Sequence, residues 1–387
     1  MISRIALTAA AGLLLGAAMT PAKAADLGGG CCADLEERVA ELEATVARKG
    51  NRVVTLQIYG DVTQGLLIWD NEDESDAYIV DNDALGSIVG FLGEAKIKPG
   101  WKAGYKMELQ IQSASSSAVD EGQNGDDPDD IIAIRHNYVY VESERFGRIS
   151  LGQQSTASDG AAEVSVANTL VSSSPDHGTQ FNPGGGLFTL GELASDFDGG
   201  RDDLIRYDSP SIYGFVLSAA WGDNDYWDVA LRYSKEWNSV KIAAAVAYAD
   251  SQTDELITGF QIENFTQVIG SISAMHVPTG LFASFSAGER EYDNDVDGSF
   301  YFLQAGLERK WFSYGTTTVY GEYGNYDDVL IEDTNAEMWG IGIVQHVDSA
   351  AMDFYAQARF WDTSADVVDV DENGELTTLM IGSRIQF

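Results

Sequence analysis

Charged residues are the groups in this chain whose types and spacing could do chemistry. Between residues 156 and 200 every Lys and Arg is missing while carboxylates recur, and basic residues stand in the alternating segments before that stretch. If these acids and bases faced each other across water, they would create a transverse electric field that orients water, sorts ions and disfavours apolar solutes. The candidate acids are Asp159, Glu163, Asp176, Glu192 and Asp196, and the candidate bases are Lys96, Lys102, Lys106, Arg135 and Arg148.

Catalytic and metal chemistry have few suitable residues. The four histidines are scattered, and the two cysteines are the neighbours Cys31 and Cys32, which excludes a Cys-rich zinc site or a disulfide scaffold. A Ser/His/Asp site like that of an outer-membrane lipase stays open as an alternative, but no nucleophile motif supports it. The sequence therefore predicts no enzyme, no catalytic residues, no cofactor and no dedicated metal site.

Two acidic motifs, 293–298 and 369–374, match the opening of a calcium-binding EF-hand loop. Their twelfth positions are Gln304 and Met380 where an EF-hand has Glu, so neither is an EF-hand. We interpret them as acidic turns, with weak divalent-cation binding by the outer loops as an alternative. The formal charge of −38 argues against nucleic acid as a partner, and 11 % aromatic residues argue against disorder.

The N-terminus predicts export. Arg4 precedes an apolar stretch over 5–19, and Ala22-Lys23-Ala24 is a small-x-small cleavage site, so residues 1–24 resemble a signal peptide cleaved near Ala24. A membrane anchor is the alternative reading of the apolar stretch, but that stretch is short and rich in alanine. A lipid anchor on Cys31 is also disfavoured, because Gly28 occupies the position where such signals carry an apolar residue.

The following residues, 25–54, predict a periplasmic segment with one short helix. Leu35, Val39, Leu42 and Val46 recur at helical spacing over 34–49, which gives two coiled-coil heptads. Two heptads are too few to be stable alone, so the helix is either an oligomerisation stub, which we favour, or docked on its own domain. The role of the cysteine pair, including interchain disulfides in an oxidising periplasm, is open.

From residue 55 the hydrophobic period changes from 3.6 to 2. In 102–112, apolar residues alternate with polar ones for eleven residues, and similar alternation recurs to the C-terminus. Sixteen such segments are separated by connections that are alternately short and mostly long, and most acids lie in the long ones. No internal apolar run of 20 residues exists. Residues 55–387 are therefore predicted to form an all-β fold, a 16-stranded antiparallel transmembrane β-barrel in a bacterial outer membrane.

A barrel of sixteen strands encloses a wide, water-filled lumen unless a segment folds into it. The third long connection, about 156–200, is the outlier in length, and it carries apolar residues such as Phe181 and Leu190 that need a surface to pack against. We predict that this segment, called loop three below, folds inward as a constriction. A mobile outer loop is the alternative.

Several segments resemble the alphaproteobacterial outer-membrane porins: 29–43, 48–52, 58–62, 206–210 and the terminal Phe387 after alternating Leu379, Ile381 and Ile385. The resemblance covers the whole chain. It implies a sixteen-stranded homotrimer whose subunits are passive diffusion pores for small hydrophilic solutes and ions, with loop three as the constriction.

The leading hypothesis is thus a general porin, and the strongly negative chain predicts a weak cation preference. The expected partners are outer-membrane lipid and lipopolysaccharide, further copies of the chain, and permeating solutes. The alternatives are a substrate-selective channel and a plugged surface adhesin or divalent-ion-binding barrel.

Overall fold

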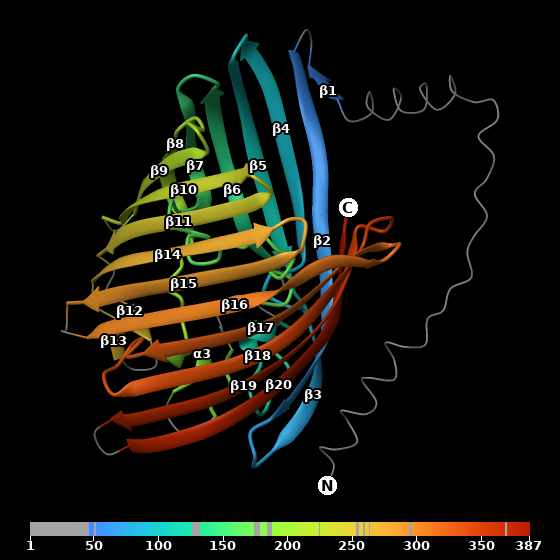
Figure 1. Ribbon diagram of the computed structural model, residues 1–387. Helices are drawn as coiled ribbons and strands as arrows, with labels where there is room; N and C mark the ends of the chain where they lie inside the picture. The colour runs from blue at the N-terminus through green and yellow to red at the C-terminus, as the bar shows by residue number, and fades with distance from the viewer. Residues whose placement is uncertain are drawn as a thin grey trace. The chain divides into compact units, whose positions relative to one another are not determined.

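The computed structural model describes residues 46–49, 52–125, 132–173, 179–183, 188–223, 225–252, 255–257, 260–262, 264–293, 296–367 and 370–387. Within these residues the chain is almost entirely β-structure, and sixteen strands form one closed antiparallel barrel (Figure 1). The barrel strands are β2 (Arg52–Asp70), β4 (Ile88–Lys98), β5 (Trp101–Ile111), β6 (Ile132–Ser143), β7 (Gly147–Ser155), β8 (Arg201–Asp208), β9 (Phe215–Gly222), β10 (Trp227–Trp237), β11 (Val240–Ser251), β14 (Phe265–His276), β15 (Leu281–Tyr292), β16 (Asp297–Phe312), β17 (Gly315–Asp327), β18 (Thr334–Val347), β19 (Met352–Val367) and β20 (Val370–Gln386).

The barrel closes where the last strand meets the first. β20 pairs with the second half of β2, from Asp61 opposite Gln386 to Asp70 opposite Thr377, and the first half of β2 pairs with β4. At this seam, Gly60 and Phe387 exchange two backbone hydrogen bonds of 3.0 Å. The predicted all-β, 16-stranded barrel is confirmed.

The alternation in sequence becomes an inner and an outer face. On β14, Ser271 and Ser273 are buried inside the barrel, whereas Val268 and Ile272 are about half exposed on the outside. This places apolar side chains outward and polar ones inward, as lipid and an aqueous interior require. None of the helices in the described ranges is both long enough and apolar enough to cross a membrane.

The short connections are tight turns. Gly100 adopts a positive φ of 73° between β4 and β5, a conformation that costs glycine little. Between β10 and β11, Asn238 and Ser239 both have positive φ, as a two-residue hairpin of the right twist demands.

On the other side, several predicted loops are continued strand. β15 and β16 extend into 289–298, and β19 and β20 extend into 362–375, because strand pairing satisfies backbone groups in water as well as in lipid. Residues 297–298 and 370–374 of the two EF-hand-like motifs therefore lie in strands. The strands consequently differ twofold in length, from 8 residues in β8 and β9 to 17 in β20 and 19 in β2.

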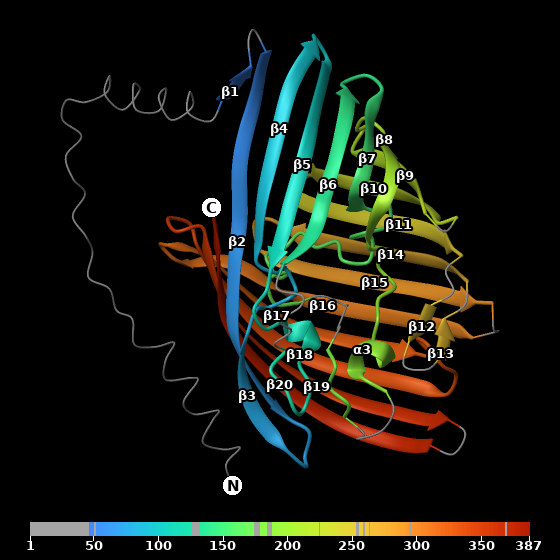
Figure 2. The same ribbon diagram turned by 180° about the vertical axis from the view of Figure 1, so that it is seen from behind.

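Smaller elements complete the long-loop side. β3 (Ser75–Val80) pairs with the end of β2, and β12 (Glu255–Ile257) and β13 (Phe260–Ile262) form a separate hairpin. A short 3₁₀ helix, η1 (Ser116–Ala118), and one α-helical turn, α3 (Leu190–Leu193), belong to long connections. Figure 2 shows α3 on the inner side of the barrel wall, where it contacts β18.

The predicted helix over 34–49 is wrong at its C-terminal end. Val46–Lys49 form strand β1, which pairs with β2 in place of a helical turn. The hydrogen bonds available from an adjacent barrel strand outweigh those of an isolated two-heptad helix. The remainder of that helix, the signal peptide with its cleavage site, and the cysteine pair lie outside the described residues and stay predictions.

Candidate functional site

Loop three lies inside the barrel and is hydrogen-bonded to its inner wall. On β14, the hydroxyls of Ser271 and Ser273 accept hydrogen bonds from the backbone N–H groups of Val164 (3.1 Å) and Val166 (3.0 Å). Further along, the backbone N–H of Asn168 donates to a Glu308 carboxylate oxygen on β16 at 2.9 Å. The hydroxyl of Ser172 lies 2.7 Å from that of Tyr320 on β17. Since these partners come from inward-facing positions on successive strands, the described parts of loop three run along the inner wall of the barrel.

The apolar side chains of loop three pack against the inner wall of the barrel, in addition to the hydrogen bonds of its backbone. Phe181 is fully buried, and its ring centroid lies 5.2 Å from that of Trp69 on the inner face of β2. Phe197 packs edge-on against Phe300 of β16 at 5.7 Å. Burial of such aromatic surface stabilises the inward fold of the loop.

The two ends of loop three are tied to one another. Asp198 accepts hydrogen bonds from the backbone N–H groups of Gly160 and of Ala162, the latter at 2.9 Å. Burial raises the pKa of Asp198 to about 8, and the nearby carboxylate of Glu163 acts in the same direction. This shift favours the protonated, neutral form of the Asp198 side chain.

Three arginines hold the start of loop three from the facing strands. Arg206 donates to the carbonyls of Ser155 (3.0 Å) and Thr156 (2.7 Å), and Arg232 donates to the carbonyl of Asp159 at 2.7 Å. Arg201 lies 4.0 Å from the Asp159 carboxylate. These arginines are not among the candidate bases: β8 directly follows the loop in the sequence, but no pattern there shows that its arginines, or Arg232 of β10, turn back to the start of the loop.

The five candidate bases divide into two groups on the wall of β4 to β7. Lys96, Lys102 and Arg148 lie toward the 99–100 turn, and Lys106 and Arg135 lie deeper. Their ion pairs within the described residues join them to strand acids: Lys102 to Glu94 (2.7 Å) and Glu142 (3.5 Å), Arg148 to Glu142 (2.6 Å), and Lys106 and Arg135 to Glu108 (3.0 and 3.2 Å). The basic wall is thus partly neutralised by its own carboxylates, which share the inward parity of the bases.

The candidate acids differ in their surroundings, although the sequence places all of them on one loop. Asp159 and Glu163 lie on the part of loop three that follows the wall, and Glu163 lines a cavity there. Glu192 caps α3 by accepting from the backbone N–H of Thr189 at 2.8 Å. Asp196 is buried and accepts from the backbone N–H of Asp198. Asp176 lies outside the described residues. The assignment of these acids and bases to opposite sides of a constriction stays a prediction.

Residues from the first two long connections also enter the lumen. The side-chain N–H of Asn82 donates to the carbonyl of Val171 in loop three at 2.9 Å. Asp83 accepts hydrogen bonds from the side chains of Gln110, at 3.0 Å, and Gln112. Asp81 is buried, and burial raises its pKa to about 6. These carboxylates were missed, because in the sequence they belong to an apparently external loop.

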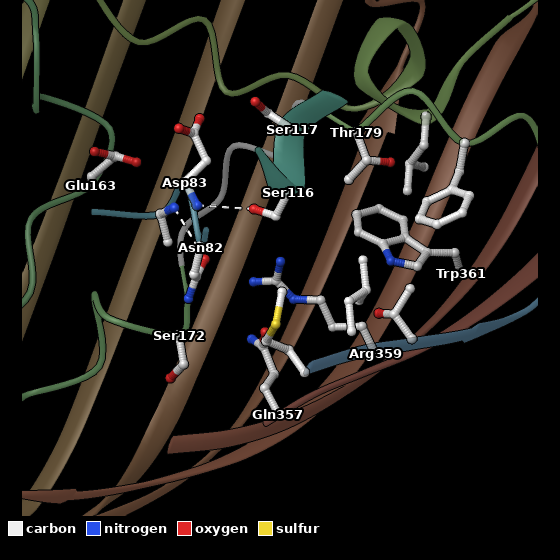
Figure 3. A pocket seen from close by; sticks show the side chains of 16 residues that line it. Asn82, Asp83, Ser116, Ser117, Glu163, Ser172, Thr179, Gln357, Arg359 and Trp361 are labelled. Atoms are coloured by element: carbon white, nitrogen blue, oxygen red, sulfur yellow. Dashed lines mark hydrogen bonds between the residues drawn. The ribbon is translucent and has the colours of Figure 1, made fainter. Parts of the chain in front are cut away.

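A cavity of ≈ 160 Å³ lies where these connections meet the wall (Figure 3). Its lining comes from β2, β19 and β20 of the barrel, from the segment around Asp83, from η1 and from loop three. Among the described residues, no group of three or more His, Cys, Asp or Glu side chains could hold a metal ion.

A closed barrel with a polar interior and an inward-folded third loop defines an outer-membrane channel. A model of the Gram-negative porin family matches residues 6–366, and the chain belongs to that family. Its location is accordingly the outer membrane, and its function is that of a diffusion channel. The family and the fold are those of passive pores and not of enzymes. The predicted porin family is confirmed, while its alphaproteobacterial origin stays a prediction.

Known proteins similar to this chain agree with that family. A chitoporin of Vibrio furnissii is 23 % identical over 280 residues, which cover 64 % of this chain and 69 % of the chitoporin. The anion-selective porin from Comamonas acidovorans superposes with a TM-score of 0.58 at 17 % identity, covering 86 % of this chain and all of that one. OmpT of Vibrio cholerae in its trimer form gives a TM-score of 0.55 at 14 % identity, covering 86 % of this chain and 99 % of that one.

Proposed function

We propose that this protein is a general diffusion porin for small hydrophilic solutes and ions, narrowed by loop three. The observation that carries the proposal is the row of hydrogen bonds from Val164, Val166 and Asn168 to β14 and β16. These bonds hold the loop against the wall, which supports a constricted lumen over a fully plugged one.

We further propose a weak preference for cations. Asp83 and Glu163 both line one shared space beside loop three (Figure 3). The bases on the wall of β4 to β7 are partly compensated by Glu94, Glu108 and Glu142. Compensated bases attract anions weakly, so the remaining carboxylates set the sign of the selectivity.

Single-channel recording in a planar bilayer with a salt gradient tests both proposals. We expect stepwise openings and a reversal potential that favours cations, and we expect Asp83→Asn and Glu163→Gln to shift that potential toward zero. The matched control is Glu236→Gln, which neutralises an exposed carboxylate of β10 beside the short turn at 238–239 and should leave the potential unchanged. Anion preference would refute the selectivity while keeping the pore, and silence from folded protein would refute the pore and favour a plugged adhesin.

The assembly and surroundings follow the same reasoning. A homotrimer is supported by the trimer form of the similar OmpT, and openings in groups of three would reveal it. Outward apolar residues such as Val268 and Ile272 support contact with outer-membrane lipid and, on the outer leaflet, lipopolysaccharide. Weak divalent-cation binding by the acidic outer hairpins is a proposal that titration with Ca²⁺ in the same recordings would test.

A substrate-selective channel is the second candidate function. The similarity to a chitoporin and the cavity beside loop three favour it. A saturable reduction of current by one solute would distinguish it from a general pore.

A further inference from the structure

The cavity beside loop three combines an apolar wall with neutral polar groups. Phe181 and Leu190 of loop three and Trp361 of β19 form the apolar part, and the side chains of Thr179, Gln357 and Ser116 are polar. Figure 3 shows Trp361 and Thr179 on one side of the space and Ser116 of η1 facing it. The volume of ≈ 160 Å³ is about ten times what one water molecule needs, so a ring-sized solute fits.

The charged groups of this cavity already have partners within the protein. Asp83 accepts from Gln110 and Gln112, and the guanidinium of Arg359 donates to Glu322 at 2.8 Å. A charged ligand would have to displace these contacts and would lose their energy. The cavity is therefore suited to a neutral solute.

Neutral hydrogen-bonding capacity remains unused. The hydroxyl of Thr179 is buried and has no hydrogen-bond partner within the described part of the chain. Gln357 donates its amide N–H to Glu322 at 2.8 Å, which leaves its carbonyl oxygen as an acceptor. A buried hydroxyl without a partner costs stability, and a ligand hydroxyl, which both donates and accepts, removes that cost.

We propose that this cavity binds one ring of a neutral saccharide and retains it during passage through the pore. A sugar ring has an apolar C–H face that packs against an aromatic side chain and a rim of hydroxyls that matches Thr179 and Gln357. The proposal deepens the proposed function, since it rests on the lumen being open and names the class of solute that the lumen selects.

Current recordings with maltotriose as the probe test this directly. For the unmodified protein we expect a reversible reduction of current that saturates with concentration. Thr179→Val should weaken the apparent affinity about fivefold, the effect of one lost hydrogen bond, and Trp361→Leu about tenfold. Thr179→Ser, which keeps the hydroxyl, should retain binding.

Matched controls sit on the outer face of neighbouring strands. Thr377→Val on β20 and Trp339→Leu on β18 make the same chemical changes at exposed positions and should leave the affinity unchanged. A size-matched polyethylene glycol controls for steric exclusion. A reduction that never saturates, that the glycol reproduces, or that both Thr179→Val and Trp361→Leu leave unchanged would overturn the proposal.

A binding measurement that does not depend on current tests the saccharide site separately from the pore. Equilibrium dialysis of labelled maltotriose against the detergent-solubilised protein should give the same order of affinities. A conducting protein that binds no maltotriose would refute the saccharide site and leave the porin intact. A protein that binds maltotriose but conducts nothing would refute the pore and the retention during passage, and would leave only the binding site.

Discussion

Asp198 decides how firmly the two ends of loop three hold together. Its pKa is raised to about 8, above the value near 4 that it has in an unfolded segment, so the folded loop binds a proton more tightly. The stabilisation is complete below about pH 4 and is lost as pH rises through 8. Hydrogen exchange at Gly160 and Ala162, corrected for the intrinsic rate, should therefore accelerate by up to about tenfold per pH unit across this window.

Asp198→Asn separates this effect from general alkaline damage. The amide matches the carboxyl in size, keeps an acceptor oxygen for one of the two backbone N–H groups, and carries no titrating proton. We expect its exchange rates, corrected in the same way, to be independent of pH between 5 and 9. Identical pH profiles in the two proteins would show that another group is responsible.

Loop three as an element depends on serine hydroxyls of the wall. The double variant Ser271→Ala/Ser273→Ala removes the acceptors of Val164 and Val166 at a cost of about 1 kcal/mol each. Because the loop would then fluctuate within the lumen, open-channel current noise should increase while the barrel remains folded. Ser234→Ala, at an exposed position of β10, is the control, and equal noise in the two variants would contradict this anchoring.

For strands and loops, the sequence predicts where the elements lie along the chain better than it predicts the contacts between them. Period-2 alternation extends over each strand, so Ser271 and Lys106 could be assigned to the inner face from their neighbours alone. Strand ends were harder, because 289–291 and 297–298 belong to an acidic, polar stretch yet pair as strands in water. The carboxylates that neutralise the bases, such as Glu108, share the same parity, but pairing across strands depends on register that the sequence does not show.

The whole barrel depends on its seam. A Cβ atom added at Gly60 would lie 2.4 Å from the carbonyl oxygen of Ile88 and 2.6 Å from the Phe387 ring. Gly60→Ala should therefore destabilise the closed barrel by about 1–3 kcal/mol. The measurement is the temperature at which the folded form is lost in semi-native electrophoresis.

Gly321→Ala is the matched control for the seam. Its added Cβ would have 3.8 Å to the nearest atom, the carbonyl oxygen of Gly340, so there is space for it. We expect no loss of folded form at the same temperature. If both variants unfolded alike, general strand propensity and not the seam would explain the effect.

The long strands β19 and β20 place a row of carboxylates along one side of the barrel mouth. About 9–11 residues cross a bilayer, so β19 and β20 project several residues, on the order of 20 Å, beyond it and carry exposed Asp362 and Asp366. That height exceeds the Debye length of about 8–10 Å at 0.1–0.15 M salt. An approaching cation is attracted before it reaches the lumen, so the mouth holds a local reservoir of cations. Diluting the bath from 1 M to 10 mM salt should then lower the conductance less than in proportion.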